Sequence, residues 1–426
     1  MKYQLKCLKC GWSSDRFHIL CPHCQKASLL KTFYTKPETD IGKCNANFSS
    51  YIDWLPIDKI TNTETAFDPK IGLFQSEQIA DLLHLDHLYI LFNGYWPEQN
   101  AFNLAGSFKT FEAISVLEKI AETEDTLIIS SAGNTARAVI QYSLMSGYRT
   151  IVVIPENAAQ FMRVQNPYKR KNCFLVTVRD GFYSEAIQTV DKIISNVGGL
   201  VREGGVYNVA RRDALGVPFI RAAIAMGQLP DHYFQAIGSG TGAIAALEAS
   251  GRLANLGLVQ QKKMRLRLSQ NAPFCPVVQA WNSQTRTYNA YEPDEYHNRI
   301  EKIMASVLSN NTPPYSVSGG LFDVLSETEG TVDCISNEQV QRAMDLFQKL
   351  KSVDLDPAAG VALASLIKAV EEKTVNSDDV ILLHLTGGGY AGISTDYAQS
   401  LYEPQMSIKP NSDMKQLYQS VETFLD

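Results

Sequence analysis

Lys109 is the residue of this sequence whose type and setting best suit covalent chemistry, in the run Gly106-Ser107-Phe108-Lys109-Thr110. Apolar side chains flank it, and loss of water around an amine lowers its pKa toward usable basicity. About twenty residues later the run Ser130 to Thr135 follows an apolar strand, and its small polar residues suit the binding of a carboxylate at a helix start. Taken singly, Lys109 also fits a solvated surface lysine, and the loop fits an ordinary turn capped by Asn134.

A glycine-rich turn in the second half of the chain suits a phosphate group. The run Ala236 to Ala243, AIGSGTGA, reads as a strand, a turn and the start of a helix. Backbone N–H groups of such a turn close on a phosphate at the positive end of the helix dipole. The turn also satisfies a dinucleotide fingerprint, but the next strand ends in Ser269-Gln270-Asn271 and lacks the acid that would hold a ribose. Lysine, carboxylate loop and phosphate turn together predict pyridoxal phosphate as cofactor.

Four cysteines near the N-terminus have the spacing of a zinc ribbon. They form two C-x2-C pairs: Cys7, Cys10, Cys21 and Cys24. Soft thiolates favour Zn²⁺ over hard cations, and four sulfurs complete a tetrahedral site, so His18 and His23 are expected to be bystanders. A redox pair at Cys-Pro-His-Cys and a metal-free remnant are the alternatives. We expect a structural zinc module that takes no part in catalysis.

Composition and charge fit a large cytoplasmic enzyme. The chain has 426 residues, 45% of them hydrophobic and 20% charged, which is enough for two or three domains with substantial cores. The formal net charge is −6 and the pI about 5.7, so the whole molecule is not attracted to nucleic acid or to anionic membranes. The start, MKYQLKCLKC, lacks the apolar core of a signal peptide, and no apolar run reaches the ~18 residues of a membrane span.

Short apolar strands alternate with helical patterns after residue 28. The segments that read as strands are 88–92, 126–130, 150–154, 173–178, 233–237, 264–268 and 379–385. Helical patterns lie between several of them, and this alternation predicts an α/β protein with parallel sheets covered by helices. The final helical pattern, from Asp413, has one apolar face and is expected to dock on the body or on a partner.

The chain resembles the fold-type II pyridoxal-phosphate enzymes, the group of tryptophan synthase β and threonine synthase, in GSFKTFEA, SSAGNTARA, AIGSGTGAIAA and ILLHLTGGGY. More narrowly, it is similar to the cysteate synthases, relatives of threonine synthase that make L-cysteate from O-phospho-L-serine and sulfite. The narrower match lies in FNGYWPE, REGGVYNVARRD, PDHYFQAIGSGTGA, LSQNAPF and PPYSVSGGLFD. With this resemblance we expect a zinc-ribbon-like module (1–28), a large cofactor-binding domain (29–110 and 200–426) and a small substrate domain (111–199).

The resemblance also implies roles for single residues. Lys109 would form the Schiff base and move the α-proton, Asn134 would bond the 3′-oxygen, and Thr386 would face the ring nitrogen. A neutral hydroxyl at that nitrogen favours β-elimination. The phosphate cup would consist of Gly238, Ser239, Gly240, Thr241 and Gly242. The loop for the substrate carboxylate would consist of Ser131, Ala132, Gly133 and Thr135.

Fixed positive charge and N–H donors are expected near the reacting carbon, because leaving phosphate and incoming sulfite are both oxyanions. The candidates for this role are Ser107, Arg137, Asn208, Arg211 and Arg212. For each arginine, a surface ion pair is the competing interpretation.

Three functions compete at this point. The first is β-replacement that converts O-phospho-L-serine and sulfite to L-cysteate and phosphate. The second keeps the cofactor but is threonine synthase or O-phosphoserine sulfhydrylase chemistry. The third is a scaffold whose cysteine module binds nucleic acid or protein, which the acidic chain and the few basic residues of that module disfavour. The resemblance further suggests a homodimer.

Overall fold

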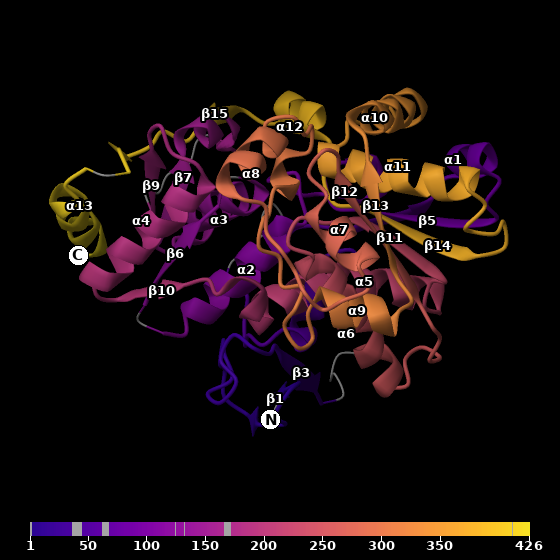
Figure 1. The fold of residues 1–426 in the computed structure, drawn as a ribbon, viewed down its shortest axis with the longest axis horizontal. Coiled ribbons are helices and arrows are strands. Elements are labelled where there is room, and N and C mark those ends of the chain that lie inside the picture. Colours follow the sequence, from indigo (N-terminus) through magenta and orange to yellow (C-terminus); the bar gives the residue numbers. More distant parts are fainter. Residues whose placement is uncertain are drawn as a thin grey trace.

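The computed structural model describes residues 2–35, 45–61, 68–123, 125–131, 133–165, 172–410 and 412–426. Two largely parallel β-sheets lie next to each other, each covered by helices, and a small module with the N-terminus lies below them in Figure 1. The expected α/β class is therefore confirmed. Within the described ranges, no helix has the length and apolar character needed to cross a bilayer.

The larger sheet has six strands in the order β13-β12-β11-β14-β5-β4. Its strands are β4 (Gly72–Gln75), β5 (His87–Phe92), β11 (His232–Ala236), β12 (Arg265–Asn271), β13 (Thr331–Ile335) and β14 (Val380–Leu385). All neighbours run parallel except β4, which is antiparallel to β5 at the edge. Both central strands, β11 and β14, are buried along their whole length, as parallel strands with covered faces are.

Helices cover both faces of the larger sheet. The helices that do not belong to the smaller sheet are α1 (Glu77–Leu83), α2 (Lys109–Ile120), α5 (Val209–Met226), α6 (Thr241–Asn255), α7 (Pro276–Asn282), α8 (Pro293–Ile300), α9 (Leu321–Glu327), α10 (Asn337–Lys351), α11 (Pro357–Glu371) and α12 (Tyr390–Asp396). Of these, α8 and α12 pack in small clusters of their own. Successive residues of a strand point to opposite faces. Leu382 accordingly packs in the core with α5 and α6, whereas Ile381 and Leu383 pack in the core with α10 and α11.

The smaller sheet has five parallel strands in the order β10-β6-β7-β9-β16. They are β6 (Thr126–Ser130), β7 (Thr150–Pro155), β9 (Cys173–Val178), β10 (Leu200–Arg202) and β16 (Met406–Ile408). Its helices are α3 (Asn134–Ser146), α4 (Tyr183–Asn196) and α13 (Lys415–Leu425). A two-stranded antiparallel ribbon, β8 (Arg163–Gln165) with β15 (Gln399–Leu401), and the 3₁₀ helix η4 (Glu156–Phe161) lie beside it.

The C-terminal helix α13 docks on the smaller sheet, at the far left of Figure 1. Leu417 and Val421 are buried in the same core cluster as Ile151 and Val176. The prediction that this helix docks on the body is confirmed. Strands β10 and β16 also pair with the smaller sheet, although both lie in the range expected for the large domain. We therefore propose a small domain that extends to residue 202 and includes 406–426.

The cysteine module is a three-stranded antiparallel sheet in the order β2-β1-β3. Its strands are β1 (Tyr3–Cys7), β2 (Ser13–Ser14) and β3 (Leu30–Tyr34). Leu5, Cys7, Cys21 and Leu30 form a small core together with Val209, the first residue of α5. The module is thereby packed against the beginning of a helix of the larger domain.

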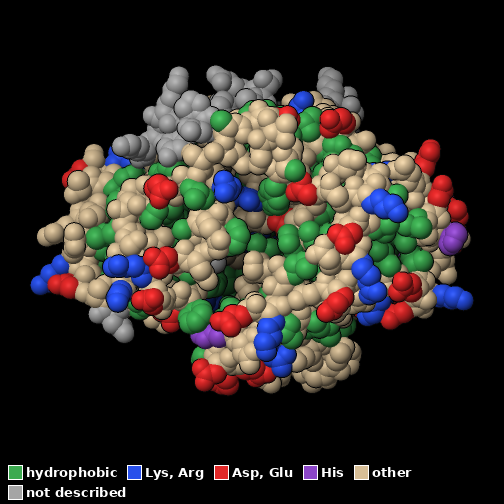
Figure 2. Space-filling model, turned by 90° about the horizontal axis from the view of Figure 1, so that it is seen from above, with side chains coloured by type: hydrophobic (Ala, Val, Ile, Leu, Met, Phe, Trp, Pro, Cys, Tyr) green, Lys and Arg blue, Asp and Glu red, His purple; other side chains and the backbone are tan. Residues whose placement is uncertain are grey.

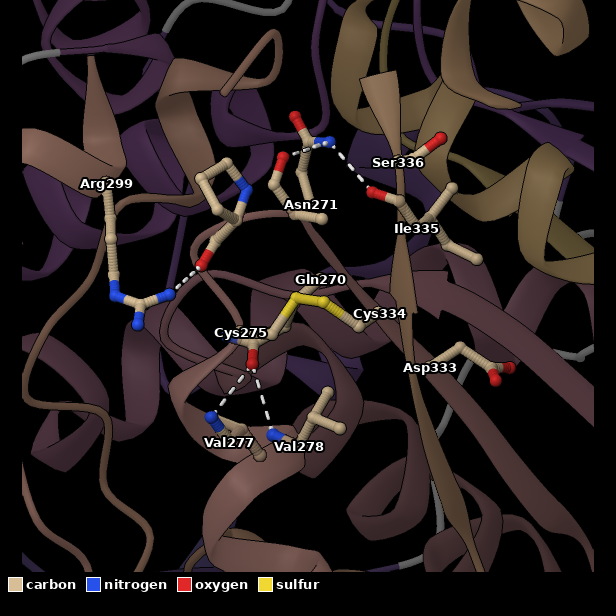
Figure 3. Close-up of a disulfide and its surroundings, with 12 residues drawn as sticks. Gln270, Asn271, Cys275, Val277, Val278, Arg299, Asp333, Cys334, Ile335 and Ser336 are labelled. Carbon is tan, nitrogen blue, oxygen red and sulfur yellow. Dashed lines mark hydrogen bonds between the residues drawn. A yellow bond between two sulfur atoms is a disulfide. The ribbon is translucent and has the colours of Figure 1, made fainter. Parts of the chain in front are cut away.

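A disulfide joins Cys275 and Cys334, a pairing that the spacing of the cysteines does not predict (Figure 3). Cys275 directly precedes α7, and Cys334 lies in the edge strand β13. The α7 start is also held by Gln270, whose side-chain oxygen accepts from the Val277 N–H over 2.8 Å. The Cys275–Cys334 disulfide thus joins the segment after β12 to the neighbouring strand β13.

Candidate active site

Lys109 is the first residue of α2, and only 17% of its side chain is exposed. The segment before it is fixed to the carboxyl end of β14. The Phe108 N–H donates to the Thr386 carbonyl over 2.9 Å, and Ser107 forms a β-bridge with Gly387. Burial lowers the pKa of the Lys109 amine, and a neighbouring carboxylate opposes this change. Such an amine is suited to attack on an aldehyde.

A tight turn sets the position of Lys109. The Asn103 side-chain amide donates to the Ser107 carbonyl over 2.6 Å, and its oxygen accepts from the Thr110 hydroxyl over 2.7 Å. Gly106 has a φ of +69°, and a Cβ there would lie 2.2 Å from the ring of Tyr390. Both the backbone conformation and the close packing therefore require glycine at this point.

The glycine turn joins β11 to α6 and lies against the lysine segment. Gly240 precedes α6 with a φ of +73°, in the left-handed region. A Cβ on Gly242 would lie 3.1 Å from the ring of Phe108. The Thr241 hydroxyl lies 2.9 Å from the Ser239 hydroxyl, so both are at the helix start. Because the first N–H groups of a helix lack partners within it, the turn Gly238–Gly242 can receive an anion.

The loop between β6 and α3, together with the first turn of α3, is connected to Lys109 by the carboxylate of Glu112. Ser131 and Gly133 belong to this loop, and the Gly133 N–H donates to the Ser131 hydroxyl over 3.4 Å. Ala132 lies outside the described residues. The Thr135 hydroxyl donates to Glu112 over 2.7 Å. Since Glu112 also contacts Lys109, two of the regions expected to form one site do lie together.

Asn134 begins α3 and takes part in a network of four side chains. Its amide nitrogen donates to Asp356 over 3.1 Å, and its oxygen accepts from Arg137 over 3.1 Å. Arg137 also donates to the Tyr390 hydroxyl over 2.8 Å, and that hydroxyl donates to Asp356 over 2.7 Å. Burial raises the pKa of Tyr390, which keeps the phenol neutral and able to donate. The network fixes the Asn134 amide relative to the β14 end of the larger sheet.

Thr386 directly follows β14 and is 6% exposed. Two residues earlier, His384 is buried, and burial lowers its pKa to about 3. Its Nδ1 lies 2.6 Å from the Tyr233 hydroxyl and its Nε2 lies 2.6 Å from the Asn93 side-chain oxygen. These partners suit a neutral imidazole that donates from Nε2 and accepts at Nδ1. The strand end below Thr386 therefore contributes no positive charge.

A cavity of about 280 Å³ lies between α3, η4, the β8–β15 ribbon and α12. It is lined by Arg137, Gln160, Arg163, Tyr390 and Ser394 among others. Figure 1 places α12 and β15 on the upper side of the molecule, and that face is hollowed near its middle in Figure 2, with Lys or Arg side chains at the edge. Among the described residues that line the cavity there is no carboxylate, so its charged groups are cationic.

The candidate residues at the start of α5, one asparagine and two arginines, already have protein partners. Asn208 caps the helix, accepting from the Ala210 N–H over 2.9 Å. Arg211 donates to Glu203 over 2.6 Å and its Nε lies 3.1 Å from Glu112. Arg212 has no exposed side-chain surface, and its Nε donates to Glu248 over 3.1 Å. Arg137, by contrast, lines the cavity described above.

Glu112 and Asp356 are central to the geometry but were not among the candidates. Glu112 is 1% exposed and contacts Lys109, Thr135 and Arg211. A helical repeat of 3.6 residues puts Glu112 on the same face as Lys109, and that spacing is the signal that could have identified it. No comparable signal marks Asp356, because it lies more than two hundred residues from Asn134 in the sequence.

The four cysteines of the N-terminal module converge as their spacing predicts. The sulfur atoms of Cys7, Cys10, Cys21 and Cys24 all lie within 4.8 Å of one another. The Cys24 N–H points to the Cys21 sulfur at 3.4 Å, an arrangement that stabilises a thiolate. His18 packs edge-on against the Trp12 ring at 5.0 Å. The cluster is compatible with one tetrahedral Zn²⁺.

The residues around Lys109 fit pyridoxal phosphate. The Ser107 hydroxyl is buried and, in the part of the chain that the structure describes, has no hydrogen-bond partner, so a polar group is expected beside it. The glycine turn has no room for side chains at Gly240 and Gly242, and a glycine turn at a helix start is the kind of backbone that binds a phosphate. A buried amine completes this set of groups.

Comparisons with known proteins agree with this geometry. Residues 76–387 match the family model described as pyridoxal-phosphate dependent enzyme. The chain is 40% identical to the cysteate synthase of Methanoregula boonei, over 96% of this chain and 94% of that protein. It is 37% identical to the cysteate synthase of Methanosarcina barkeri, over 96% of this chain and 97% of that protein.

Solved structures share the fold at low sequence identity. Maize serine racemase superposes with a TM-score of 0.57 and 14% identity, covering 83% of this chain and 93% of that one. A pyridoxal 5′-phosphate-dependent aspartate racemase gives a TM-score of 0.56 at 14% identity, covering 75% and 90%. The resemblance stated from sequence is confirmed. The chain belongs to the pyridoxal-phosphate dependent enzymes and, within them, to the cysteate synthase family.

Proposed function

We propose that this protein converts O-phospho-L-serine and sulfite to L-cysteate and phosphate by a pyridoxal-phosphate-dependent β-replacement. One observation carries the proposal: the segment of Lys109 contacts three other segments predicted to form the site. These are the glycine turn, the end of β14 and, through Glu112, Thr135 at the start of α3. The name cysteate synthase, which relatives at 36–40% identity carry, supports this choice of substrates.

Residues of four segments would hold the cofactor. Lys109 would bond its aldehyde, Asn134 its 3′-oxygen and Thr386 its ring nitrogen. The phosphate would be bound by Gly238, Ser239, Gly240, Thr241 and Gly242. When bound, pyridoxal phosphate withdraws electrons from the substrate α-carbon, and a neutral hydroxyl at the ring nitrogen directs this toward elimination at the β-carbon.

The chain's own residues would bind the substrate and move its proton. Ser131, Gly133 and Thr135 would bind the carboxylate, together with Ala132, which lies outside the described residues. The Ser107 hydroxyl would donate to an oxyanion beside the reacting carbon. The Lys109 amine would take the α-proton, which a base of lowered pKa can do near neutral pH.

Arg137 is our preferred contact for the oxyanions of substrate and nucleophile. It lines the cavity between the domains, and no carboxylate of the described ranges pairs with it. We expect Asn208, Arg211 and Arg212 to act through the protein instead. Asn208 caps α5, and each of the two arginines is already paired with a carboxylate, whereas Arg137 donates to the neutral groups of Asn134 and Tyr390.

Arg137→Ala should raise the KM for O-phospho-L-serine by about 10-fold or more. A hydrogen bond to a charged group contributes about 1.5–3 kcal/mol, and 1.4 kcal/mol corresponds to a factor of ten. Steady-state phosphate release measures this effect. Arg342→Ala, at an exposed position of α10, serves as the control and should leave KM unchanged. An unchanged KM in Arg137→Ala would remove this residue from the substrate site.

A product assay tests the proposed function directly. Purified protein is incubated with O-phospho-L-serine, with and without sulfite, and phosphate and L-cysteate are measured. Sulfite-dependent cysteate is the expected result. Cysteine formed with sulfide instead would indicate an O-phosphoserine sulfhydrylase, and turnover of O-phosphohomoserine would indicate a threonine synthase. The family membership disfavours the scaffold reading, since it predicts catalysis.

We further propose a structural Zn²⁺ in the cysteine module, a homodimer, cytoplasmic localisation, and no nucleic-acid partner. The cluster of four sulfurs supports the zinc site. The acidic net charge and the family resemblance support the other assignments.

Metal analysis should find one zinc ion per chain, and Cys21→Ser should release it. Cys21 is fully buried in the small core of the module, so loss of the metal should also lower the Tm by at least about 5 °C. Zinc content and a thermal melt measure the two effects. Cys173→Ala, a buried free cysteine of β9, is the control and should retain zinc. Zinc-free wild-type protein with an unchanged melt in Cys21→Ser would contradict the assignment.

A further inference from the structure

Four charged side chains form an alternating series beside the cofactor site: Lys109, Glu112, Arg211 and Glu203. Lys109 Nζ lies 3.0 Å from Glu112 Oε2, and Arg211 Nε lies 3.1 Å from the same oxygen. Arg211 Nη1 donates to both oxygens of Glu203, over 2.7 and 2.6 Å. The roles proposed so far make no use of Glu112 or Glu203.

The position of Glu112 is fixed from three elements. It lies on α2, accepts from the Thr135 hydroxyl of α3 through Oε1, and contacts Arg211 of α5 through Oε2. Its side chain is 2% exposed and that of Arg211 is 12% exposed, so water screens these charges weakly. Tyr183 of α4 is a further titratable group near Arg211, and burial raises its pKa, which leaves it neutral.

The charge count of the series depends on the protonation of Lys109. With an ammonium at Lys109, the series has two cations and two anions. With a neutral amine, or with the amine bonded to an aldehyde without a proton, one negative charge is in excess. An opposite charge at hydrogen-bond distance stabilises the ionised form of a buried group.

We propose that Glu112 is the counter-ion of Lys109. Its carboxylate pairs with the Lys109 amine whenever that amine is not bonded to the cofactor, and it stabilises the ammonium that forms when Lys109 takes the substrate α-proton. This inference rests on the proposed role of Lys109 as proton acceptor. The proton passes from the α-carbon to Lys109 Nζ and returns to the α-carbon after the nucleophile has added. Glu112 stays ionised throughout because of the positive charge of Arg211, which Glu203 holds in position.

The directions of the pKa values agree with this assignment. Burial lowers the pKa of Lys109, Glu112 opposes that change and Arg211 adds to it. Burial acts to raise the pKa of Glu112, but the charges of Arg211 and Lys109 outweigh it and the pKa is lowered. Glu112 is therefore a carboxylate over the pH range in which a lysine amine titrates.

The test measures the pKa of Lys109 itself. The full-length chain, freed of cofactor, is treated with formaldehyde and cyanoborohydride over a pH series, and mass spectrometry quantifies labelling of the Lys109 peptide. Labelling follows the neutral amine. Glu112→Gln should lower the pH of half-maximal labelling by about 1–3 pH units, because it removes the opposite charge. Arg211→Gln should shift it upward, because it removes a like charge.

Two further variants complete the experiment. Glu118→Gln carries the same substitution on the same buried helix, but Glu118 bonds Tyr142 and Tyr148 and should leave the Lys109 profile unchanged. Glu112→Asp retains the charge and should keep most of the wild-type profile. A wild-type profile in Glu112→Gln, or shifts of the same sign in Glu112→Gln and Arg211→Gln, would overturn the inference. If Glu112→Gln does not fold, the upward shift in Arg211→Gln decides it.

The labelling experiment and the product assay can fail independently, since labelling of Lys109 needs neither phosphoserine nor sulfite. If pyridoxal phosphate fails to protect Lys109 from labelling, the cofactor assignment is wrong and the inference falls with it. If protection occurs but no cysteate forms, the substrates are wrong while the counter-ion role stands. In holoenzyme, Glu112→Gln should also move the pH optimum of phosphate release, which a purely structural role would leave in place.

Discussion

Lys109→Ala is expected to abolish phosphate release from O-phospho-L-serine, with a loss of at least about 10³-fold in kcat. The variant lacks both the amine that bonds the cofactor aldehyde and the base that takes the α-proton. Within the described residues, no other lysine side chain pairs with Glu112, so no neighbouring amine takes its place. The visible absorption that arises from a lysine-bound cofactor should disappear as well.

Absorption spectra and phosphate release measure the two effects. Lys119→Ala is a matched control, because Lys119 lies on the same helix and pairs with Glu122 over 2.5 Å. It should keep both colour and activity. A second check is borohydride reduction of the wild-type protein, which should fix the cofactor on the Lys109 peptide. A coloured, active Lys109→Ala, or a label on another lysine, would falsify the central assignment.

The strands were predictable because buried parallel strands are continuous apolar runs. Segments 126–130 and 173–178 coincide with β6 and β9 as observed. The prediction for β12 ended at 268, whereas the strand continues to Asn271. Its last residues are polar but buried, and Asn271 pairs with Ile335 of β13. A hydrophobic pattern cannot predict such a strand end, because its buried side chains are polar and form hydrogen bonds with residues far away in the sequence.

Several segments predicted to form the site lie together in the fold: the Lys109 segment contacts the end of β14, the glycine turn and, through Glu112, Thr135. These segments follow strands of a parallel sheet or begin helices, where such sites occur. What sequence could not supply is the set of partners. Asp356 bonds Asn134 from another domain, and Glu203 reaches Arg211 from the loop after β10. Such contacts depend on long-range packing, so the residue type alone does not reveal them.

The cysteine module has a physical connection to the site that its sequence does not suggest. Val209 packs in the module core, and the Tyr207 hydroxyl donates to the Lys26 carbonyl over 2.9 Å. Gly204 packs against Ile19. These contacts hold the start of α5, from which Arg211 reaches Glu112. The cysteine module is therefore connected by packing to the helix start that carries Arg211.

Arg212→Met should lower the free energy of unfolding by about 3–5 kcal/mol, the range for removal of one partner from a buried ion pair. Arg212 is fully buried, and besides Glu248 it binds the carbonyls of Leu30 and Val206. Among the described residues, the substitution leaves Glu248 paired only with the more distant Arg252, at 3.8 Å. It also removes a link between the cysteine module and α5.

Urea unfolding measures the loss of stability, with Arg342→Met as the exposed control that should change it little. The KM for O-phospho-L-serine of the folded protein should remain near the wild-type value, in contrast to Arg137→Ala. Arg211 and Arg212 are adjacent in sequence, but successive helical residues point about 100° apart, so one faces the lysine site and the other the core. A large rise in KM with unchanged stability in Arg212→Met would restore this residue to the substrate site and refute the structural role.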